Sequence, residues 1–321
     1  MINIYNNMLF YLYFWMQIKT RILMTIIPKK LYKYKPILDD KQLLDTKGEL
    51  LKDSKGKIVD NGLDALSKGM IWFSKPAALN DPFDCQLKIN IDSQYFEEPA
   101  LYLNALGMNA SNAKIFASVI YSCKNQGMNN QQIINHIEQL LKQSGYPTLK
   151  NQLSAYKNTL EQQMADLGIL SLTPANNNLL MWAHYAGFHN GYCLEFDTFE
   201  DHNELNVLKS PSLTRPVVYG DYYPSLIDLK PFDAVQDDLI DNLLCYKSNE
   251  WSYENEWRCI QQHGNKLYPF PGKLTGVIFG ARCSDVAQTA IMKAIQNLPY
   301  KPSLYYSIIR SNRFAVEIVK I

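Results

Sequence analysis

The chain has almost no excess of charge of either sign. Lys and Arg together number 32 and Asp and Glu together number 31, which gives a formal net charge of +1. A net charge this small provides no overall attraction to nucleic acid or to an anionic membrane surface. Any anionic ligand must therefore bind at a local patch of the surface.

Cysteine is scarce and forms no motif. The six cysteines are spread along the chain without a C-x-x-C pair or a cysteine-rich cluster, so no structural zinc site is indicated. Free cysteine is among the most buried residue types, and each one is expected to fill a core position. This usage fits a reducing compartment, and we expect a cytoplasmic protein. The positions are Cys85, Cys123, Cys193, Cys245, Cys259 and Cys283.

The longest apolar run is too short to cross a bilayer. Residues 8–18 (MLFYLYFWMQI) end at Lys19, well short of the roughly 20 residues that a spanning helix needs. No positive charge precedes the run and no small-residue cleavage pattern follows it, so a signal peptide is not indicated. Because Met24 is a second candidate start, residues 1–24 are treated as an uncertain N-terminal extension, with an anchor helix as the alternative. We expect no membrane partner.

Motifs of common metal sites are missing. The H-E-x-x-H motif of zinc proteases and the D-x-D-x-D-G loop of calcium sites are both absent. His184 and His189 lie five positions apart, whereas two zinc ligands on one helix face would lie four apart. We therefore expect no metal, and we interpret the two histidines as structural or as ligand-contacting side chains.

What the chain does contain is typical of a folded globular protein. Hydrophobic residues make up 47% and charged residues 20% of the 321 positions, close to the averages for such proteins. This length is enough for one large or two ordinary domains with a sizeable core. No internal repeat is visible.

Short apolar runs and helical periodicities alternate along the chain. This mixed order predicts an α+β fold, which we interpret as a single domain over residues 25–321. Strands are expected at residues 31–37, 70–74, 169–172, 192–196, 215–221, 274–280 and 314–321. Helices are expected at residues 63–69, 181–186, 233–248 and 284–298, with Ser284 as the N-cap of the last.

A helical insertion is expected at about residues 96–166. The composition changes there to Asn, Gln, Leu, Ile and Lys. Apolar side chains recur at spacings of three and four, which places them on one face of a helix. They are Ile133, Ile134, Ile137, Leu140 and Leu141.

Residues 75–85 (KPAALNDPFDC) consist largely of turn-forming types. The side chains of Asn80, Asp81 and Asp84 are spaced so that they could converge on a cation or orient the loop. Asx-turn capping explains the same pattern. Since irregular loops often carry function, we keep Asn80 and Asp81 as candidate site residues.

Residues 251–258 (WSYENEWR) combine two carboxylates, an arginine and three aromatic rings. If this segment is a strand, side-chain alternation places Glu254, Glu256 and Arg258 on one face. Two carboxylates about 7 Å apart repel each other, and Arg258 can supply the offsetting charge. A solvated strand face with an internal salt bridge is the alternative, although the flanking tryptophans favour a core or pocket wall.

Four segments together resemble a known family. They are LYKY from Leu31, SKPAALNDPFDC from Ser74, MWAHYAGFHNGYCLEF from Met181 and WSYENEWR from Trp251. In this order the chain resembles an uncharacterised bacterial family of domains of unknown function over roughly residues 31–280. The order of elements is also similar to the ADP-ribosyltransferase superfamily, above all to its DNA-modifying, toxin-like members. That resemblance implies an ADP-ribosyltransferase-like mixed β-sheet core and an enzyme that consumes NAD.

The resemblance assigns roles to particular residues. It places the catalytic acid on Glu256, the second member of an E-x-E pattern that begins at Glu254. The basic residue of the first strand falls on Lys33, where the superfamily more often has Arg or His, and Lys lacks the forked geometry of Arg. Tyr34 lies beside it. A serine or aromatic residue of the middle strands falls on Ser74, Ser171 or Tyr185, and the sequence does not choose among them.

The implied chemistry suits these residues. Cleavage of the bond between nicotinamide and ribose passes through an oxocarbenium-like state, which a nearby carboxylate such as Glu256 stabilises. Glu254 would orient or deprotonate the acceptor, and general acid/base help of this kind contributes ~10² to 10⁴ in rate. Contacts with NAD, as substrate, are expected from Tyr34, Ser74, Asn80, Asp81, Trp182, His184, Tyr185 and Arg258.

The leading hypothesis is therefore an NAD-consuming enzyme that transfers ADP-ribose to a nucleic acid or protein, or hydrolyses NAD, as a bacterial defence effector or toxin. One alternative is a non-catalytic module that senses a nucleotide or a partner. Another is a metal-dependent nuclease using Asp81, Asp84 and Glu256. The sequence indicates neither the acceptor nor the oligomeric state.

Overall fold

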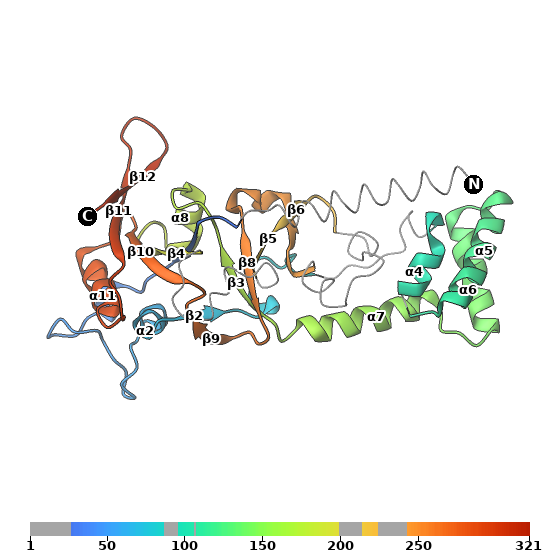
Figure 1. The fold of residues 1–321 in the computed structure, drawn as a ribbon, viewed down its shortest axis with the longest axis horizontal. Coiled ribbons are helices and arrows are strands. Elements are labelled where there is room, and N and C mark those ends of the chain that lie inside the picture. Colours follow the sequence, from blue (N-terminus) through green and yellow to red (C-terminus); the bar gives the residue numbers. More distant parts are fainter. Residues whose placement is uncertain (1–26, 87–95, 106, 199–213, 224–242) are drawn as a thin grey trace. The chain divides into compact units, whose positions relative to one another are not determined.

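The computed structural model describes residues 27–86, 96–105, 107–198, 214–223 and 243–321, so the N-terminal extension lies outside the described residues. The chain forms two compact units (Figure 1). Helices and several β-sheets occur together, which confirms the α+β class. The sheet unit comprises Met1–Ala78, Leu167–Tyr219 and Asn249–Ile321, and the helical unit comprises Leu79–Asp166 and Gly220–Ser248.

A five-stranded sheet is the centre of the sheet unit. Its order is β1-β4-β10-β11-β12, in which β10 and β11 are parallel and all other neighbours are antiparallel. The parallel pair is connected through helix α11 (Asp285–Ile295). The strands are β1 (Lys30–Lys35), β4 (Tyr192–Asp197), β10 (Lys273–Phe279), β11 (Ser303–Ile309) and β12 (Val316–Lys320).

Side-chain alternation gives this sheet two different apolar faces. One face, with Leu194 and Val277, belongs to the core that also contains residues of α2 (Asn61–Ser67) and α11. The opposite face, with Cys193 and Ile278, packs with α8 (Leu179–Tyr185). The burial of both faces explains why β4 is a continuous buried strand.

Capping side chains and a glycine define the ends of two helices, whose bounds lie within a few residues of the expected ones. The Ser284 hydroxyl accepts a hydrogen bond from the backbone N–H of Ala287 at 3.0 Å, which caps α11 as expected. Asp60 caps α2 in the same way through Leu63. Gly69 follows α2 with a φ of 65°, the left-handed conformation that ends many helices.

Two smaller sheets complete the sheet unit. Strand β8 (Trp257–Gln261) lies between β3 (Gly168–Leu172) and β5 (Thr214–Pro216), while β2 (Met70–Phe73) pairs with β9 (Lys266–Pro269). Isolated bridges join these sheets, since Tyr32 pairs with Thr173 and Ser74 pairs with Ile169. The remaining short elements of this unit are η1 (Asp40–Gln42), η2 (Pro76–Ala78), η4 (Asn249–Glu254) and most of β6 (Val218–Gly220). Strand β7 (Tyr246–Ser248) belongs to the helical unit.

Two expectations about secondary structure need correction, and two strands were missed. The strand expected at 215–221 is two short strands, β5 and β6, because Pro216 cannot donate to a ladder and ends β5. The helix expected at 233–248 does not reach its predicted end, since Tyr246–Ser248 is strand β7, and residues 233–242 lie outside the described residues. Strands β9 and β11 were not anticipated.

The helical unit contains the four helices of the expected insertion. In α6 the side chains of Ile133, Ile137 and Leu141 are fully buried, as their spacing predicts. The helices are α4 (Pro99–Ala105), α5 (Ala110–Asn125), α6 (Asn130–Gln143) and α7 (Leu149–Met164). Within the described part of the chain, none of the helices combines the length and the apolar character needed to cross a membrane. The interpretation of 25–321 as one domain stays a prediction.

The cysteines lead to a first testable prediction. All six are free thiols, and only Cys85 among them is not buried. Burial raises the pKa of the Cys259 thiol to about 12, and burial together with Asp40 and Asp285 raises that of Cys283 to about 12. Because the thiolate is the reactive form and a raised pKa reduces its fraction, we expect one fast-reacting thiol at about pH 8 and five that react only in urea.

A chromogenic thiol reagent measures this directly, in native buffer and then in denaturant. Cys85→Ser should remove the fast phase and leave the slow one. Two or more fast thiols in the native protein would contradict the burial described here.

Candidate functional site

The E-x-E segment is bent between its two carboxylates. Glu254 is the last residue of η4, Glu256 precedes β8, and Asn255 between them has a φ of 45°. Asn is among the few residues that adopt this left-handed conformation readily. The expected strand alternation is therefore wrong for Glu254, and only Glu256 and Arg258 keep the spacing of two.

Glu256 and Arg258 form a buried bidentate ion pair. The Nε and Nη2 atoms of Arg258 donate to the two carboxylate oxygens of Glu256 at 2.9 and 3.1 Å. Arg258 is 0% and Glu256 3% exposed. The alternative of a solvated strand face is thus wrong, and the fork geometry is the strong form of this interaction.

Glu254 is buried as well, but it has a different partner. Its carboxylate accepts a hydrogen bond from the hydroxyl of Tyr185, the last residue of α8. At the other end of α8, the N-cap residue Asn178 donates through Nδ2 to the carbonyl of Tyr253 at 2.8 Å. Both ends of α8 are thereby attached to the segment that carries the two carboxylates.

A tyrosine that the sequence reasoning missed belongs to the same group. The backbone N–H of Glu256 donates to the hydroxyl of Tyr219 at 2.7 Å. Burial raises the pKa of Tyr219, and the charges of Glu256 and Glu254 add to this effect while Arg258 opposes it. The phenol therefore keeps its proton at neutral pH. We call Tyr185, Tyr219, Glu254, Glu256 and Arg258 the carboxylate cluster.

Aromatic rings lie beside this cluster. His184 is exposed, with its ring centroid 6.4 Å from that of Tyr185 and 6.3 Å from that of Tyr253. The ring of Trp251 lies 6.0 Å from Tyr253. His184 and Tyr185 are thus brought to the same place as the carboxylates, and their contact with one ligand stays a prediction.

Trp182 and Tyr34 are placed differently. Trp182 is fully buried and its indole N–H donates to the carbonyl of Asn176 at 2.9 Å. Tyr34 is also buried and meets Trp182 edge-on, with ring centroids 5.0 Å apart. Both side chains hold α8 on the sheet, and their direct contact with a cofactor stays a prediction that this burial does not support.

Lys33 on β1 and Ser74 after β2 both form hydrogen bonds with residues of β3. The ammonium of Lys33 donates to the carbonyl of Ser171 at 2.9 Å, and Ser171 is the partner of Arg258 in the β3–β8 register. Ser74 exchanges two backbone hydrogen bonds with Ile169, at 2.8 and 2.9 Å. Lys33 is therefore near the strand that carries Arg258, whereas the main chain of Ser74 has a structural role.

Asn80 and Asp81 belong to the helical unit, whereas the carboxylate cluster belongs to the sheet unit. Asp81 is buried and its side chain accepts a hydrogen bond from the N–H of Phe83 at 2.9 Å, which forms the Asx turn considered above. Asp84 is buried too, 3.8 Å from the ammonium of Lys247. These contacts show a loop held by its own carboxylates.

Another buried carboxylate, Glu195, was not singled out from the sequence. It lies on β4 and is bound by the ammonium of Lys30 and by the hydroxyls of Tyr32 at 3.1 Å and Thr275 at 2.8 Å. The available signal was an ionisable residue inside the otherwise apolar run YCLEF. Charged residues are almost never fully buried unless they are paired, so this position predicts a partner network.

A known protein family matches a segment of the chain that contains part of this site. The family described as "Protein of unknown function (DUF2971)" matches residues 181–259, from α8 to β8. This segment contains Tyr185, Glu254, Glu256 and Arg258. No curated protein and no solved structure matches the chain. The resemblance to an uncharacterised family is thereby confirmed, and it is residues 181–259 that are similar to this family.

Proposed function

We propose that this protein is an ADP-ribosyltransferase-like enzyme that cleaves NAD and transfers ADP-ribose to a nucleic acid or protein, or to water. The observation that supports this is the pair of buried carboxylates with different partners, Glu254 with a tyrosine hydroxyl and Glu256 with an arginine. Two carboxylates in unlike environments are the usual arrangement for dividing acid–base and electrostatic roles.

In this proposal Glu256 remains an anion because Arg258 lies against it. Its charge stabilises the positive ribose as the bond from C1′ to nicotinamide breaks and nicotinamide leaves with the bonding electrons. Glu254 takes the proton of the acceptor group or water as that group bonds to C1′. The rings near His184 and Tyr185 would hold the dinucleotide. Such an activity would suit a defence effector or toxin.

One specific feature favours a competing function. Both oxygens of Glu256 are engaged by Arg258, and Arg258 has no exposed surface. An ion pair of this kind also serves simply to hold β8 in place. The rings around His184 would then recognise a nucleotide without chemistry, as in a sensing module. The nuclease hypothesis stays a prediction.

Nicotinamide release from NAD tests the enzyme. We expect release by the wild-type chain and a loss of about 10² to 10³ in rate for Glu256→Gln, the range seen when one charge-stabilising group is removed. Glu254→Gln should slow transfer by about 10² or more, because it removes the acceptor base. The control is Lys142→Ala, an exposed change on α6.

Urea unfolding of each variant separates lost chemistry from lost folding. If wild type and Glu256→Gln are equally inert with nucleic-acid and protein acceptors, yet both bind NAD, the sensing module replaces the enzyme.

A further inference from the structure

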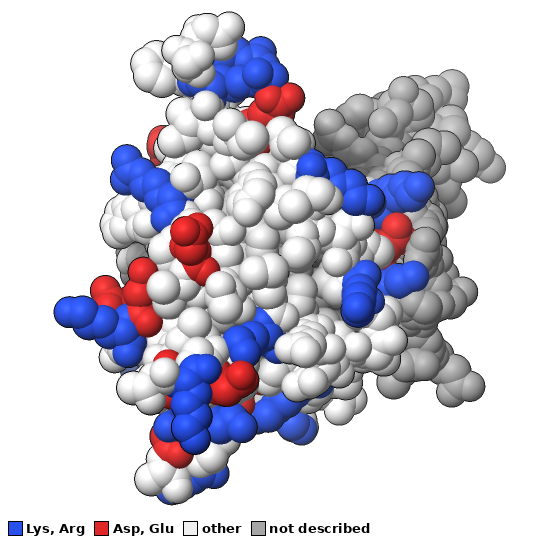
Figure 2. Space-filling view, turned by 90° about the vertical axis from the view of Figure 1, so that its left-hand side faces the viewer, with Lys and Arg blue, Asp and Glu red and all other residues white. Residues whose placement is uncertain are grey.

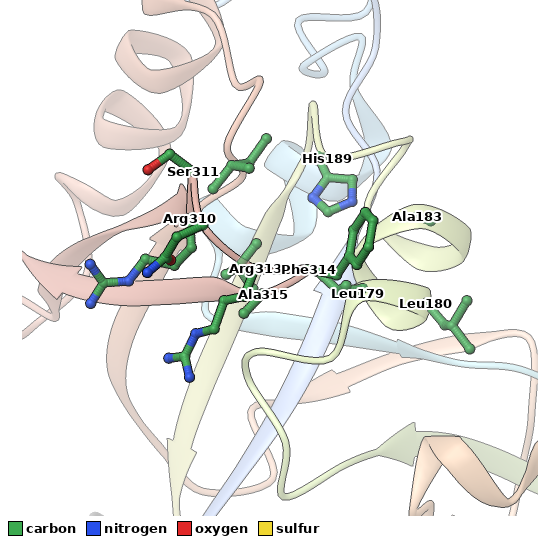
Figure 3. Close-up of a pocket in the computed structure, with 12 residues that line it drawn as sticks. Leu179, Leu180, Ala183, His189, Arg310, Ser311, Arg313, Phe314 and Ala315 are labelled. Carbon is green, nitrogen blue, oxygen red and sulfur yellow. The ribbon is translucent and has the colours of Figure 1, made fainter.

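A second site is built on another face of α8. A pocket of about 680 Å³ lies between α8 and the turn that joins β11 to β12 (Figure 3). From α8 it is lined by Leu179, Leu180 and Ala183. Successive helix residues are rotated by about 100°, so these three share a face from which Tyr185 points away. The pocket is therefore distinct from the carboxylate cluster.

A histidine that lines this pocket has an unsatisfied ring nitrogen. The Nδ1 atom of His189 is buried and has no hydrogen-bond partner among the described residues. Buried polar atoms are nearly always hydrogen-bonded, so this nitrogen is an exception in the wall of the pocket. Burial and the nearby Arg282 lower the pKa of His189, which leaves a neutral imidazole at pH 7.

The backbone holds this histidine in an unusual conformation. Three successive residues are left-handed, Gly187, Phe188 and His189, with φ of 55°, 57° and 71°. The N–H of His189 donates to the carbonyl of Trp182 at 3.2 Å, and the two rings stack with centroids 6.2 Å apart. Such conformations are unfavourable for residues other than glycine, and they persist where the surroundings enforce them. The imidazole is thus positioned before any ligand arrives.

The opposite wall supplies positive charge and an exposed ring. In Figure 3, Arg310 and Arg313 extend from the β11–β12 turn and away from His189. In Figure 2, blue side chains gather on the projection at the top of the view. Arg310 pairs with Glu317, so residues 309–317 carry two positive charges and one negative charge. Phe314, which follows Arg313, is 101% exposed.

We propose that this pocket binds one base of a single-stranded nucleic acid. An apolar slot with a neutral imidazole suits the face and the edge of an unpaired base, and the rim arginines suit its flanking phosphates. The exposed ring of Phe314 provides a surface on which the next base stacks, and aromatic stacking together with backbone cations is how single strands are usually held. Bases stacked inside a duplex cannot enter such a slot. The proposal does not depend on cleavage of NAD.

Fluorescence anisotropy with a labelled oligothymidylate of about twelve nucleotides tests the site in the full chain. We expect Phe314→Ala to weaken binding about tenfold, the usual effect of losing one stacking contact. Arg313→Gln should reduce the slope of log K against log salt by about 0.7, the value for one phosphate on a single strand. The matched control is Phe83→Ala, which removes an exposed phenylalanine of the helical unit.

His189→Phe tests the unpartnered nitrogen, because it keeps a ring over Trp182 and removes both nitrogens. His189→Phe should weaken binding of the oligothymidylate. His189→Asn should retain more of this binding, because asparagine tolerates the left-handed backbone. Thermal melts confirm that the variants fold. The proposal would be overturned if wild type and Phe314→Ala bound the oligomer with equal affinity. It would also be overturned if the wild-type protein bound thymidine monophosphate as tightly as the oligomer. Equal competition by polyglutamate would also overturn it, since only generic attraction would remain. Nicotinamide release is measured separately, so either proposal can fail alone.

Discussion

Arg258→Met is expected to lower the free energy of unfolding by about 3–5 kcal/mol, the range measured when one partner of a buried ion pair is removed. The methionine fills most of the space of the arginine stem, so the loss is mainly electrostatic. Without the guanidinium, the carboxylate of Glu256, only 3% exposed, would be buried beside Glu254 without its fork of donors. A buried carboxylate of this kind costs more than the original pair gains.

Urea unfolding followed by circular dichroism measures the change, and pH supplies a second signature. A buried carboxyl without its cation has a folded-state pKa above the unfolded value, so it binds protons more readily when folded and its stability contribution falls as pH rises. The decrease in the free energy of unfolding caused by Arg258→Met should therefore be smaller near about pH 5 than near about pH 7. The double variant Glu256→Gln/Arg258→Met should recover part of the stability.

The matched control is Lys30→Met beside Glu195. That carboxylate is equally buried but keeps the hydroxyls of Tyr32 and Thr275, and Lys30 is 35% exposed. A loss of about 1 kcal/mol is expected there, because a partly exposed lysine is largely solvated in both states. If both variants lose the same amount, Arg258 has no special role in holding the carboxylate cluster.

Gly191→Ala is the second large effect, with an expected loss of about 3 kcal/mol, the upper part of the range for overpacked interiors. A Cβ atom at this position would lie 2.1 Å from the carbonyl oxygen of Lys35 and 3.0 Å from that of Ala186. Both contacts are with backbone, which cannot rotate away. The absence of a side chain at Gly191 therefore allows close approach of the chain itself.

This substitution should also disturb the pocket. Gly191 accepts a hydrogen bond from the N–H of Gly280 at 2.9 Å, and its own N–H binds Ala186 at 2.8 Å, so it closes the turn that carries His189. Oligothymidylate binding should weaken together with stability. Gly48→Ala is the comparison, because the added Cβ meets nothing within 4 Å and only the φ of 73° opposes it. A loss of about 1 kcal/mol is expected there, and an equal loss at both positions would argue against the clash.

Much of the secondary structure follows from local pattern. The spacing of Ile133, Ile137 and Leu141 predicts their burial in α6, and Ser284 predicts the start of α11. The failures share one cause. β7 and β9 exist because other segments pair with them or bury them. The sequence of three or four residues does not predict such pairing with a distant segment.

The candidate site divides in a similar way. The sequence was enough to select Glu254, Glu256 and Arg258, because two acids and a base so close together imply mutual neutralisation. It also indicated that Arg258 offsets the charge. The bend at Asn255, which gives the acids different partners, depends on how η4 meets β8. Tyr219 joins them from a distant part of the chain, and its own sequence neighbourhood carries no signal.

The sequence alone determined that this is an α+β protein with a helical insertion, with a run of acids and rings between residues 251 and 258 and a glycine-bounded turn after α8. These features arise from local spacing and from backbone preferences of single residues. The tertiary structure alone decided that Trp182 lies inside while His189 lines a pocket, although the two are only seven positions apart. Burial is set by what packs against a side chain. Here that is β4, which is near in sequence, together with β1 and the β11–β12 turn, which come from more than a hundred residues away.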